Sequence, residues 1–221
     1  MKNKTSQRQL LREKRKAQKR RTIYISFAVI LGTAVIFGSI VFLSKYLSKP
    51  ANYETSEGFT LGDPEAPVEV IAFSNYSCSF CKIYSETIEK DLISGYVDPG
   101  EIYYRYVNLA NSDEDSANAA EASYCAAEQN KFFEYKSYLY TYAMAGDGFS
   151  LENLTKYARL ANLDTENFGK CMSENQYAEA YIQDRSYAQS AGIRATPTFL
   201  VNGQLVNANE LISTIDGVLG K

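Results

Sequence analysis

The sequence predicts an α/β protein in which a small sheet is interrupted by a helical segment and preceded by one transmembrane helix. Three observations support this fold class: an uncharged apolar run near the N-terminus, β-rich segments at both ends of the remaining chain, and a proline-free stretch of helix-forming residues between them. A chain of 221 residues is long enough to bury a core without a metal or a disulfide. The cysteines are therefore not required for bulk stability.

The first predicted element is a membrane-spanning helix at residues 23–43. These 21 residues carry no charge, and at about 1.5 Å per residue they can cross a hydrocarbon core of roughly 30 Å. The run is longer than the apolar region of a signal peptide, and no clear cleavage site follows it, which favours an uncleaved anchor. The basic block at residues 14–21 predicts that the N-terminus is cytoplasmic and that the rest of the chain lies outside the cell membrane.

The charge changes sign along the chain. The first 21 residues contain ten basic side chains, whereas residues 51–221 contain 11 basic and 25 acidic side chains, a net charge of −14. A domain this acidic is poorly suited to bind nucleic acid through its phosphates, so no nucleic-acid partner is expected. The polar residues 44–61 predict a linker between the anchor and the globular part.

The globular part is expected to begin with a strand, a helix and a second strand. Residues 68–73 (VEVIAF) are mostly β-branched or apolar and lie between a proline and turn-forming residues, a pattern typical of a buried strand. Apolar side chains recur at steps of three to five residues over residues 79–93, which predicts an amphipathic helix. Residues 102–109 (IYYRYVNL) predict the second strand.

A helical segment and a hairpin are expected to follow. The proline-free stretch predicts about four helices, at residues 116–129, 131–143, 151–163 and 166–191, with the last one broken. Beyond them, strands at 198–201 and 204–206 flank the turn Asn202-Gly203, which is the strongest hairpin signal in the chain. A final helix is predicted at residues 208–219.

Cys78 and Cys81 lie at the predicted junction between the first strand and the helix after it. Unpaired N–H groups and the helix dipole favour negative charge at a helix N-terminus, so the Cys78 thiol is expected to ionise more easily than a free cysteine. Cys81, about one helical turn further, can resolve a mixed disulfide formed by Cys78 or close a disulfide with it. The pattern predicts a redox-active pair with Cys78 as the nucleophile.

Three alternatives compete with a redox role for this pair. A zinc site normally takes four cysteine or histidine ligands, but the chain has no histidine and Cys125 and Cys171 are isolated in the sequence, so no metal is expected. A structural bond between Cys78 and Cys81 would close too short a loop to contribute much to stability. The third alternative is that the spacing of the two cysteines is a coincidence.

Cys125 and Cys171 both fall in the predicted helical segment. In an oxidising compartment an even set of cysteines is expected to be paired, and a bond between these two would close a loop of about 47 residues, stabilising the fold by on the order of 4 kcal/mol. We therefore expect a structural disulfide. A redox relay between the two cysteine pairs is the alternative, and the alanines around Cys125, typical of helix packing, argue against it.

Two segments of the chain resemble the DsbA-like thiol:disulfide oxidoreductases. The first joins GDPEAPV, a strand and FSNYSCSFC over residues 62–81, and the second is GIRATPTF at residues 192–199. The second segment is similar to the family pattern Gly-(Val/Ile)-x-(Gly/Ala)-x-Pro-x-Phe. The resemblance covers about residues 62–219 and implies a thioredoxin fold with an inserted α-helical domain, and a cis peptide bond before Pro197 that faces the cysteine pair.

The resemblance also implies how the chain is divided. The expected parts are a basic cytoplasmic segment (1–22), the anchor (23–43), the linker (44–61), a thioredoxin-like domain (62–112 and 193–221) and an inserted helical domain (113–192). Thr196 and Pro197 are expected to position an extended substrate peptide beside Cys78, much as a strand adds to a sheet edge. An ordinary trans proline that opens a strand is the alternative.

Two positions depart from the family pattern. Ser79 and Phe80 stand between the cysteines where many members have Pro-His, so no imidazole stabilises the Cys78 thiolate and a less oxidising couple is expected. Ala72 stands where many relatives have a buried carboxylate. The proton of Cys81 then needs another route, such as water, because Glu69 is expected to point away from the pair.

The sequence therefore predicts a membrane-anchored, extracytoplasmic thiol:disulfide oxidoreductase. We expect a dithiol oxidase that forms disulfides in unfolded or reduced exported proteins, without an organic cofactor. The resemblance implies a quinone-linked membrane partner for its re-oxidation. The alternatives are a reductase or isomerase on the same fold, since direction depends on reduction potential and partner, and a redox-inactive peptide-binding module.

Overall fold

The computed structural model describes residue 32 and residues 58–110 and 113–221. Nearly all of the predicted anchor at 23–43, and the linker up to residue 57, lie outside these ranges. Among the described residues, no helix combines the length and the apolar character needed to span a bilayer. The described residues from 58 onward belong to one compact unit.

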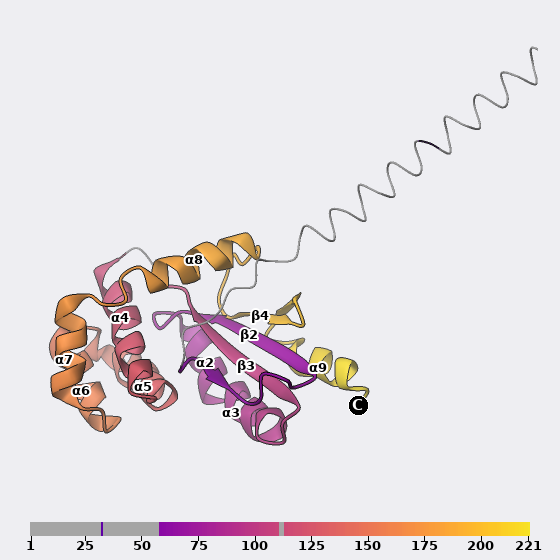
Figure 1. Ribbon diagram of the computed structural model, residues 1–221, viewed down its shortest axis with the longest axis horizontal. Coiled ribbons are helices and arrows are strands. Elements are labelled where there is room, and N and C mark those ends of the chain that lie inside the picture. The colour runs from indigo at the N-terminus through magenta and orange to yellow at the C-terminus, as the bar shows by residue number, and fades with distance from the viewer. Residues whose placement is uncertain (1–31, 33–57, 111–112) are drawn as a thin grey trace, which may run out of the picture. The chain divides into compact units, whose positions relative to one another are not determined.

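A five-stranded mixed sheet forms the centre of this unit (Figure 1). Its strands are β1 (Thr60–Leu61), β2 (Val68–Ser74), β3 (Ile102–Asn108), β4 (Thr198–Val201) and β5 (Gln204–Asn207), in the order β1-β3-β2-β4-β5. β2 and β3 are parallel, and the other neighbours are antiparallel. The sequence predicted β2 to β5 but not β1, because two residues are too few to show a periodic pattern.

The predicted helix at residues 79–93 is divided in the structure. It consists of α2 (Ser79–Glu86), α3 (Ile88–Leu92) and the π-helical turn η1 (Ile93–Val97). Thr87 separates α2 from α3, because its φ and ψ of −122° and −84° are not helical, and its hydroxyl donates a hydrogen bond to the Ile83 carbonyl at 2.6 Å. The division lets the chain turn beneath the sheet before β3.

Each face of the sheet has its own core, because successive strand side chains point to opposite faces. On one face Val70 and Phe199 pack with Tyr84 of α2 and Ile215 of the last helix, α9 (Leu211–Leu219). On the other face Phe73 and its neighbours pack against α8 (Ala180–Ser190). The strand β2 is therefore almost wholly buried, as its apolar sequence predicted.

A block of helices lies between β3 and β4 in the chain and beside the sheet in Figure 1. It contains α4 (Glu114–Glu128), α5 (Phe132–Tyr138), the π-helical η2 (Leu139–Asp147), α6 (Leu151–Leu160) and α7 (Thr165–Glu174), followed by α8. Side chains of Asp113, Ser150 and Asp164 accept hydrogen bonds from N–H groups in the first turns of α4, α6 and α7. The last predicted helix is broken, as expected, because Asn175 ends α7 with a left-handed conformation.

The core of this helical block extends to the sheet. Its buried members include Phe132, Tyr157 and Phe168 from the helices, together with Tyr106 of β3 and Cys81 of α2. The helical block therefore packs against Cys81 and contributes to its burial. This contact bears directly on the chemistry of the pair.

Candidate active site

Cys78 is the N-cap residue of α2, at the end of a short turn that follows β2. Asn75 shapes this turn: its carbonyl accepts a hydrogen bond from Cys78 N at 3.1 Å, and its side-chain oxygen accepts one from Ser77 N at 2.7 Å. Its side-chain nitrogen donates to the Leu109 carbonyl, which follows β3, at 2.6 Å. The buried asparagine thus fixes the loop that presents Cys78.

The Cys78 thiol is partly exposed and ionises more easily than usual. Partial burial by itself would raise the pKa, but the Thr196 side chain and the N–H groups of Cys81 and Phe80 stabilise the thiolate by more, so that the pKa of Cys78 is lowered. Both N–H groups belong to the first turn of α2. This is the effect that the position at a helix N-terminus predicted.

The Cys81 thiol has the opposite character. It is fully buried, and burial raises its pKa to about 11, although the Ser74 and Thr196 side chains and the Asn75 backbone act in the other direction. At neutral pH Cys81 therefore keeps its proton, and Cys78 is the readier nucleophile. The structure gives both sulfurs as free thiols.

The segment before β4 meets the cysteine pair. The Thr196–Pro197 peptide bond is cis, as the family resemblance implied, so the alternative of a trans proline is wrong. The Thr196 carbonyl accepts a hydrogen bond from Cys78 Sγ at 3.4 Å, across 118 residues of sequence. Because this carbonyl can bond only to the protonated thiol, it is released when Cys78 ionises and can then accept from a bound peptide.

A network of buried hydroxyl groups lies near Cys81. Tyr140 Oη, from η2, lies 3.0 Å from Ser74 Oγ and 3.0 Å from Tyr106 Oη, and it donates to the Asn75 carbonyl at 3.4 Å. Burial raises the pKa of both tyrosines well above the usual value, so they remain neutral and act through hydrogen bonds. The sequence alone did not predict this network, although 18 tyrosines in a chain without histidine or tryptophan are a compositional signal.

Ala72 and Glu69, the two positions considered for the route of the Cys81 proton, are placed as expected. Ala72 is buried in β2 and contributes no polar group. Glu69 forms an ion pair with Arg105 at 2.7 Å, near the start of β2, and its backbone N–H bonds to Asn202. Glu69 is thus engaged at the opposite end of β2 from the cysteine turn.

A second feature that the sequence did not predict is a buried ion pair between Glu89 of α3 and Lys136 of α5. Tyr104 Oη donates a hydrogen bond to Glu89 at 2.6 Å, and the Lys136 ammonium lies 5.0 Å from the centre of the Tyr106 ring. Burial lowers the pKa of Lys136, against the attraction of Glu89. The pair joins the segment after the active-site helix to the helical block.

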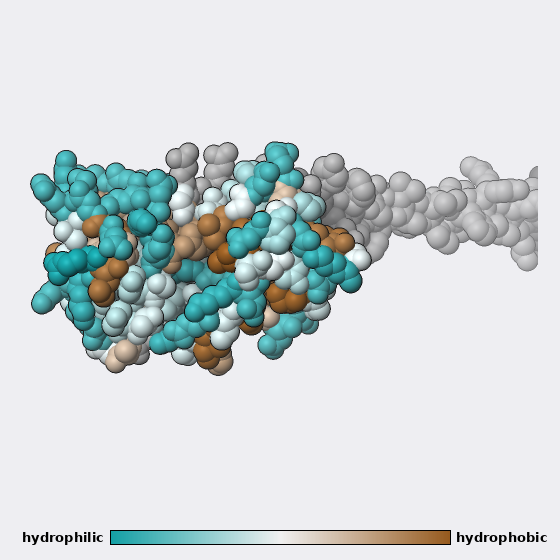
Figure 2. Space-filling model, turned by 90° about the horizontal axis from the view of Figure 1, so that it is seen from below, coloured by the Kyte–Doolittle hydropathy of each residue, from teal (hydrophilic) through white to brown (hydrophobic). Residues whose placement is uncertain are grey.

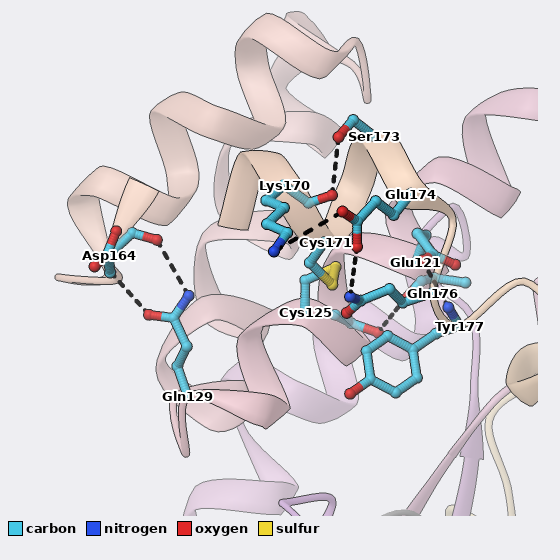
Figure 3. The surroundings of a disulfide bond; sticks show 12 residues. Glu121, Cys125, Gln129, Asp164, Lys170, Cys171, Ser173, Glu174, Gln176 and Tyr177 are labelled. Atoms are coloured by element: carbon cyan, nitrogen blue, oxygen red, sulfur yellow. Dashed lines mark hydrogen bonds and ion pairs between the residues drawn. A yellow bond between two sulfur atoms is a disulfide. The ribbon is translucent and has the colours of Figure 1, made fainter. Parts of the chain in front are cut away.

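Cys125 of α4 and Cys171 of α7 form a disulfide, with their Cα atoms 5.9 Å apart (Figure 3). This confirms the pairing expected from the sequence. Glu121 lies beside the bond, one helical turn before Cys125, and its carboxylate accepts a hydrogen bond from Tyr177 N at 2.8 Å. Glu121 and the two sulfurs are the one group of possible metal ligands in the part of the chain that the structure describes, but the sulfurs are bonded to each other.

The surface around Cys78 is partly apolar. Ser79 is exposed, and Phe80 and Ile83 have exposed fractions of 70% and 56%, which places two large apolar side chains in solvent on α2. Figure 2 shows hydrophobic patches interspersed with hydrophilic residues on one face of the molecule. Exposed apolar side chains beside a reactive thiol suit contact with an unfolded polypeptide.

Comparison with known sequences identifies related proteins over most of the chain. Residues 54–221 match the family described as thioredoxin. The probable disulfide bond formation protein D of Bacillus anthracis is 28% identical over 211 residues, covering 90% of this chain and 95% of its own length. The Na(+)/H(+) antiporter NhaA 3 of Salinispora tropica is 29% identical over 143 residues, 65% of this chain, but the matched part spans only 21% of that antiporter.

Solved structures show the same fold. The oxidised BdbD of Bacillus subtilis superposes with a TM-score of 0.67 at 23% identity, covering 77% of this chain and 100% of that one. The DsbA of Chlamydia trachomatis superposes with a TM-score of 0.67 at 24% identity, covering 76% and 94%. At these identities the likeness establishes the thioredoxin fold with its mixed sheet and helices.

Proposed function

This chain belongs to the thioredoxin family, and we propose that it is a DsbA-like thiol:disulfide oxidoreductase that acts as a dithiol oxidase on exported proteins. The observation that carries the proposal is the inequality of the two thiols. The pKa of the partly exposed Cys78 is lowered, and that of the buried Cys81 is raised to about 11. An accessible nucleophile and a protected resolving thiol are what disulfide exchange requires. The name of the B. anthracis relative agrees with this activity.

In the oxidising direction the reaction starts from a Cys78–Cys81 disulfide. A substrate thiolate attacks Cys78 Sγ, the bond between the two cysteines breaks, and its electron pair leaves on Cys81, which takes up a proton. The second substrate thiolate then attacks the substrate sulfur of the mixed disulfide, and Cys78 leaves as a thiolate. Two electrons pass from the substrate to the pair, and the lowered pKa of Cys78 makes it the better leaving group in the second step.

Thr196 and Pro197 are proposed to align the substrate. The Thr196 carbonyl already contacts Cys78 Sγ at 3.4 Å, so a peptide backbone that bonds to Thr196 brings its own cysteine to the reacting sulfur. Pro197 has no N–H group, so it cannot donate a hydrogen bond that would compete for the carbonyl groups of the peptide. The side chains of Ser79 and Phe80 add no ionisable group, so the thiolate depends on Thr196, the N–H groups of α2 and the Cys81 thiol.

We place the catalytic domain on the extracytoplasmic side of the cell membrane. Residues 23–43 are proposed as a single-pass anchor, because they form an uncharged run long enough to cross a membrane. Residues 1–22 are proposed to lie in the cytoplasm, because they contain the basic block. The Cys125–Cys171 disulfide supports an oxidising location. Re-oxidation needs a two-electron acceptor, and we propose a quinone-linked membrane protein for this role.

Two measurements test the proposal. A Cys78→Ser variant is expected to lose the oxidation of a reduced, unfolded protein, and oxidation at the normal rate by this variant would refute the assignment. The equilibrium of the Cys78–Cys81 pair with glutathione gives its reduction potential. A reduction potential of about −120 mV supports an oxidase, and one of about −270 mV supports a reductase.

A further inference from the structure

A groove beside Thr196 is lined by two arginines. It has a volume of about 320 Å³ and lies where β2 and β3 end, against α8 and the segment that precedes β4. Its polar lining consists of Asn75, Arg185, Gln189, Arg194 and Thr196. The ends of parallel strands are a common location for ligand sites in α/β proteins.

The positive charge of this groove contrasts with the rest of the domain. Residues 51–221 contain four arginines and are strongly acidic overall, yet two of the four arginines line this groove and none of its described lining residues is acidic. Asp184, next to Arg185 on α8, is turned inward: it accepts hydrogen bonds from Tyr124 Oη at 2.5 Å and from Asn108 N at 3.2 Å. The charged side chains that line the groove are therefore basic within an acidic domain.

The backbone holds Arg194 in a fixed place. Gly192 ends α8 with a φ of 78°, and its N–H donates to the Gln189 carbonyl at 3.1 Å. The next residue, Ile193, is buried, and its N–H donates to the Ala188 carbonyl at 2.9 Å. Arg194 itself is exposed and forms no ion pair with any residue in the ranges that the structure describes.

The groove adjoins the reacting sulfur. Thr196 lines it, and the carbonyl of Thr196 accepts the hydrogen bond from Cys78 Sγ. Asn75 also lines it, and its carbonyl accepts from Cys78 N. Because Thr196 and Asn75 both line the groove and bond to Cys78, a substrate whose cysteine meets Cys78 can place a neighbouring residue in the groove.

We propose that this groove binds an acidic side chain of the substrate polypeptide, close in sequence to the reacting cysteine, and that Arg194 determines this preference. The inference rests on the proposed function and deepens it by naming the substrate class. A guanidinium group can bind a carboxylate through two parallel hydrogen bonds. The site is open to solvent, so the attraction is modest and decreases with salt.

The test uses three dithiol peptides that differ only at the two positions flanking one cysteine, which carry aspartate, serine or lysine. Their oxidation by the full-length protein, recycled with oxidised glutathione, gives kcat/KM for each. We expect the aspartate peptide to exceed the lysine peptide by about three- to tenfold at low salt, the range for one or two exposed ion pairs. The net negative charge of the domain alone would favour the lysine peptide.

The variant Arg194→Glu is expected to reverse the preference, and Arg194→Gln to reduce it. The matched control is Arg159→Glu, an exposed arginine on α6 with the same change of charge, which is expected to leave the ratio unchanged. Suppose that the wild-type protein oxidises the serine peptide but its kcat/KM for the aspartate peptide does not exceed that for the lysine peptide. That result overturns the inference and leaves the proposed function intact. An unchanged ratio in Arg194→Glu also overturns it. Failure to oxidise any of the peptides rejects the proposed function and the inference together.

Discussion

The hydroxyl group of Tyr140 offers a sharp test of how this site handles the Cys81 proton. Replacement of Tyr140 by phenylalanine keeps the ring and removes Oη, which lies 3.0 Å from both Ser74 Oγ and Tyr106 Oη. A buried hydroxyl left without a partner costs about 1–3 kcal/mol. Tyr140→Phe leaves the Tyr106 hydroxyl without this partner, so one such cost is expected in the free energy of unfolding.

The same change is expected to slow the step carried out by Cys81. The Ser74 side chain lowers the pKa of Cys81, and Tyr140 holds the Ser74 hydroxyl in place. When this support is removed, the pKa of Cys81 rises further and the thiolate fraction at neutral pH falls. A hydrogen bond to a charged group is worth about 1.5–3 kcal/mol, and a partial loss equal to one pKa unit lowers the thiolate fraction about tenfold. Because a thiolate of higher pKa is intrinsically more nucleophilic, the net reaction is expected to slow by about threefold.

The assay follows the release of a chromogenic thiol from a mixed disulfide on Cys78, since Cys81 must attack to release it. The Tyr140→Phe protein should show the slower release at pH 7 and a rise in rate displaced to higher pH. Tyr138→Phe is the matched control, because no hydrogen bond of the Tyr138 hydroxyl is found among the described residues. A folded Tyr140→Phe protein with the rate and pH profile of the wild type would refute the role of the network.

Three further predictions concern the pair and the core around it. In the reduced protein, the rate at which iodoacetamide alkylates Cys78 should rise with pH through a midpoint below that of a free cysteine. Buried Cys81 should react appreciably only near its pKa of about 11, and peptide mass mapping distinguishes the two alkylated residues. Lys136→Met should destabilise the protein by about 3–5 kcal/mol in urea unfolding, because it leaves the Glu89 carboxylate buried and unpaired, and Lys136→Met with Glu89→Gln should recover part of that loss. Replacing both cysteines of the α4–α7 disulfide by alanine should lower the free energy of unfolding by on the order of 4 kcal/mol while the folded protein still oxidises peptides, and loss of oxidation in the folded variant would instead favour a relay.

The parts of this site that the sequence could predict depend on local chemistry. Cys78 follows an apolar strand and precedes an amphipathic helix, so its place at a helix N-terminus can be read from about 20 residues. The disulfide partners could be inferred because the assignment of Cys78 and Cys81 to a redox pair left only Cys125 and Cys171. The predicted helix over residues 79–93 was less accurate, because Thr87 adopts a non-helical conformation that divides it.

The parts that the sequence could not predict depend on contacts between distant residues. Tyr140 meets Ser74 across 66 residues and Tyr106 across 34, and nothing in the local pattern of η2 distinguishes Tyr140 from its neighbours. The Glu89 and Lys136 pair is likewise invisible, since charged residues on helices are ordinarily solvent-exposed. These groups acquire their roles only when the helical block closes over α2 and β3.

The asymmetry between the two thiols can thus arise without the imidazole or the buried carboxylate of the predicted family. Burial against the helical block raises the pKa of Cys81, and the first turn of α2 together with Thr196 lowers that of Cys78. Because hydroxyl groups stabilise a thiolate without accepting its proton, the Cys81 proton must still pass to solvent or to a substrate group. The network around Tyr140 should therefore change how fast Cys81 reacts more than it changes which of the two cysteines is attacked.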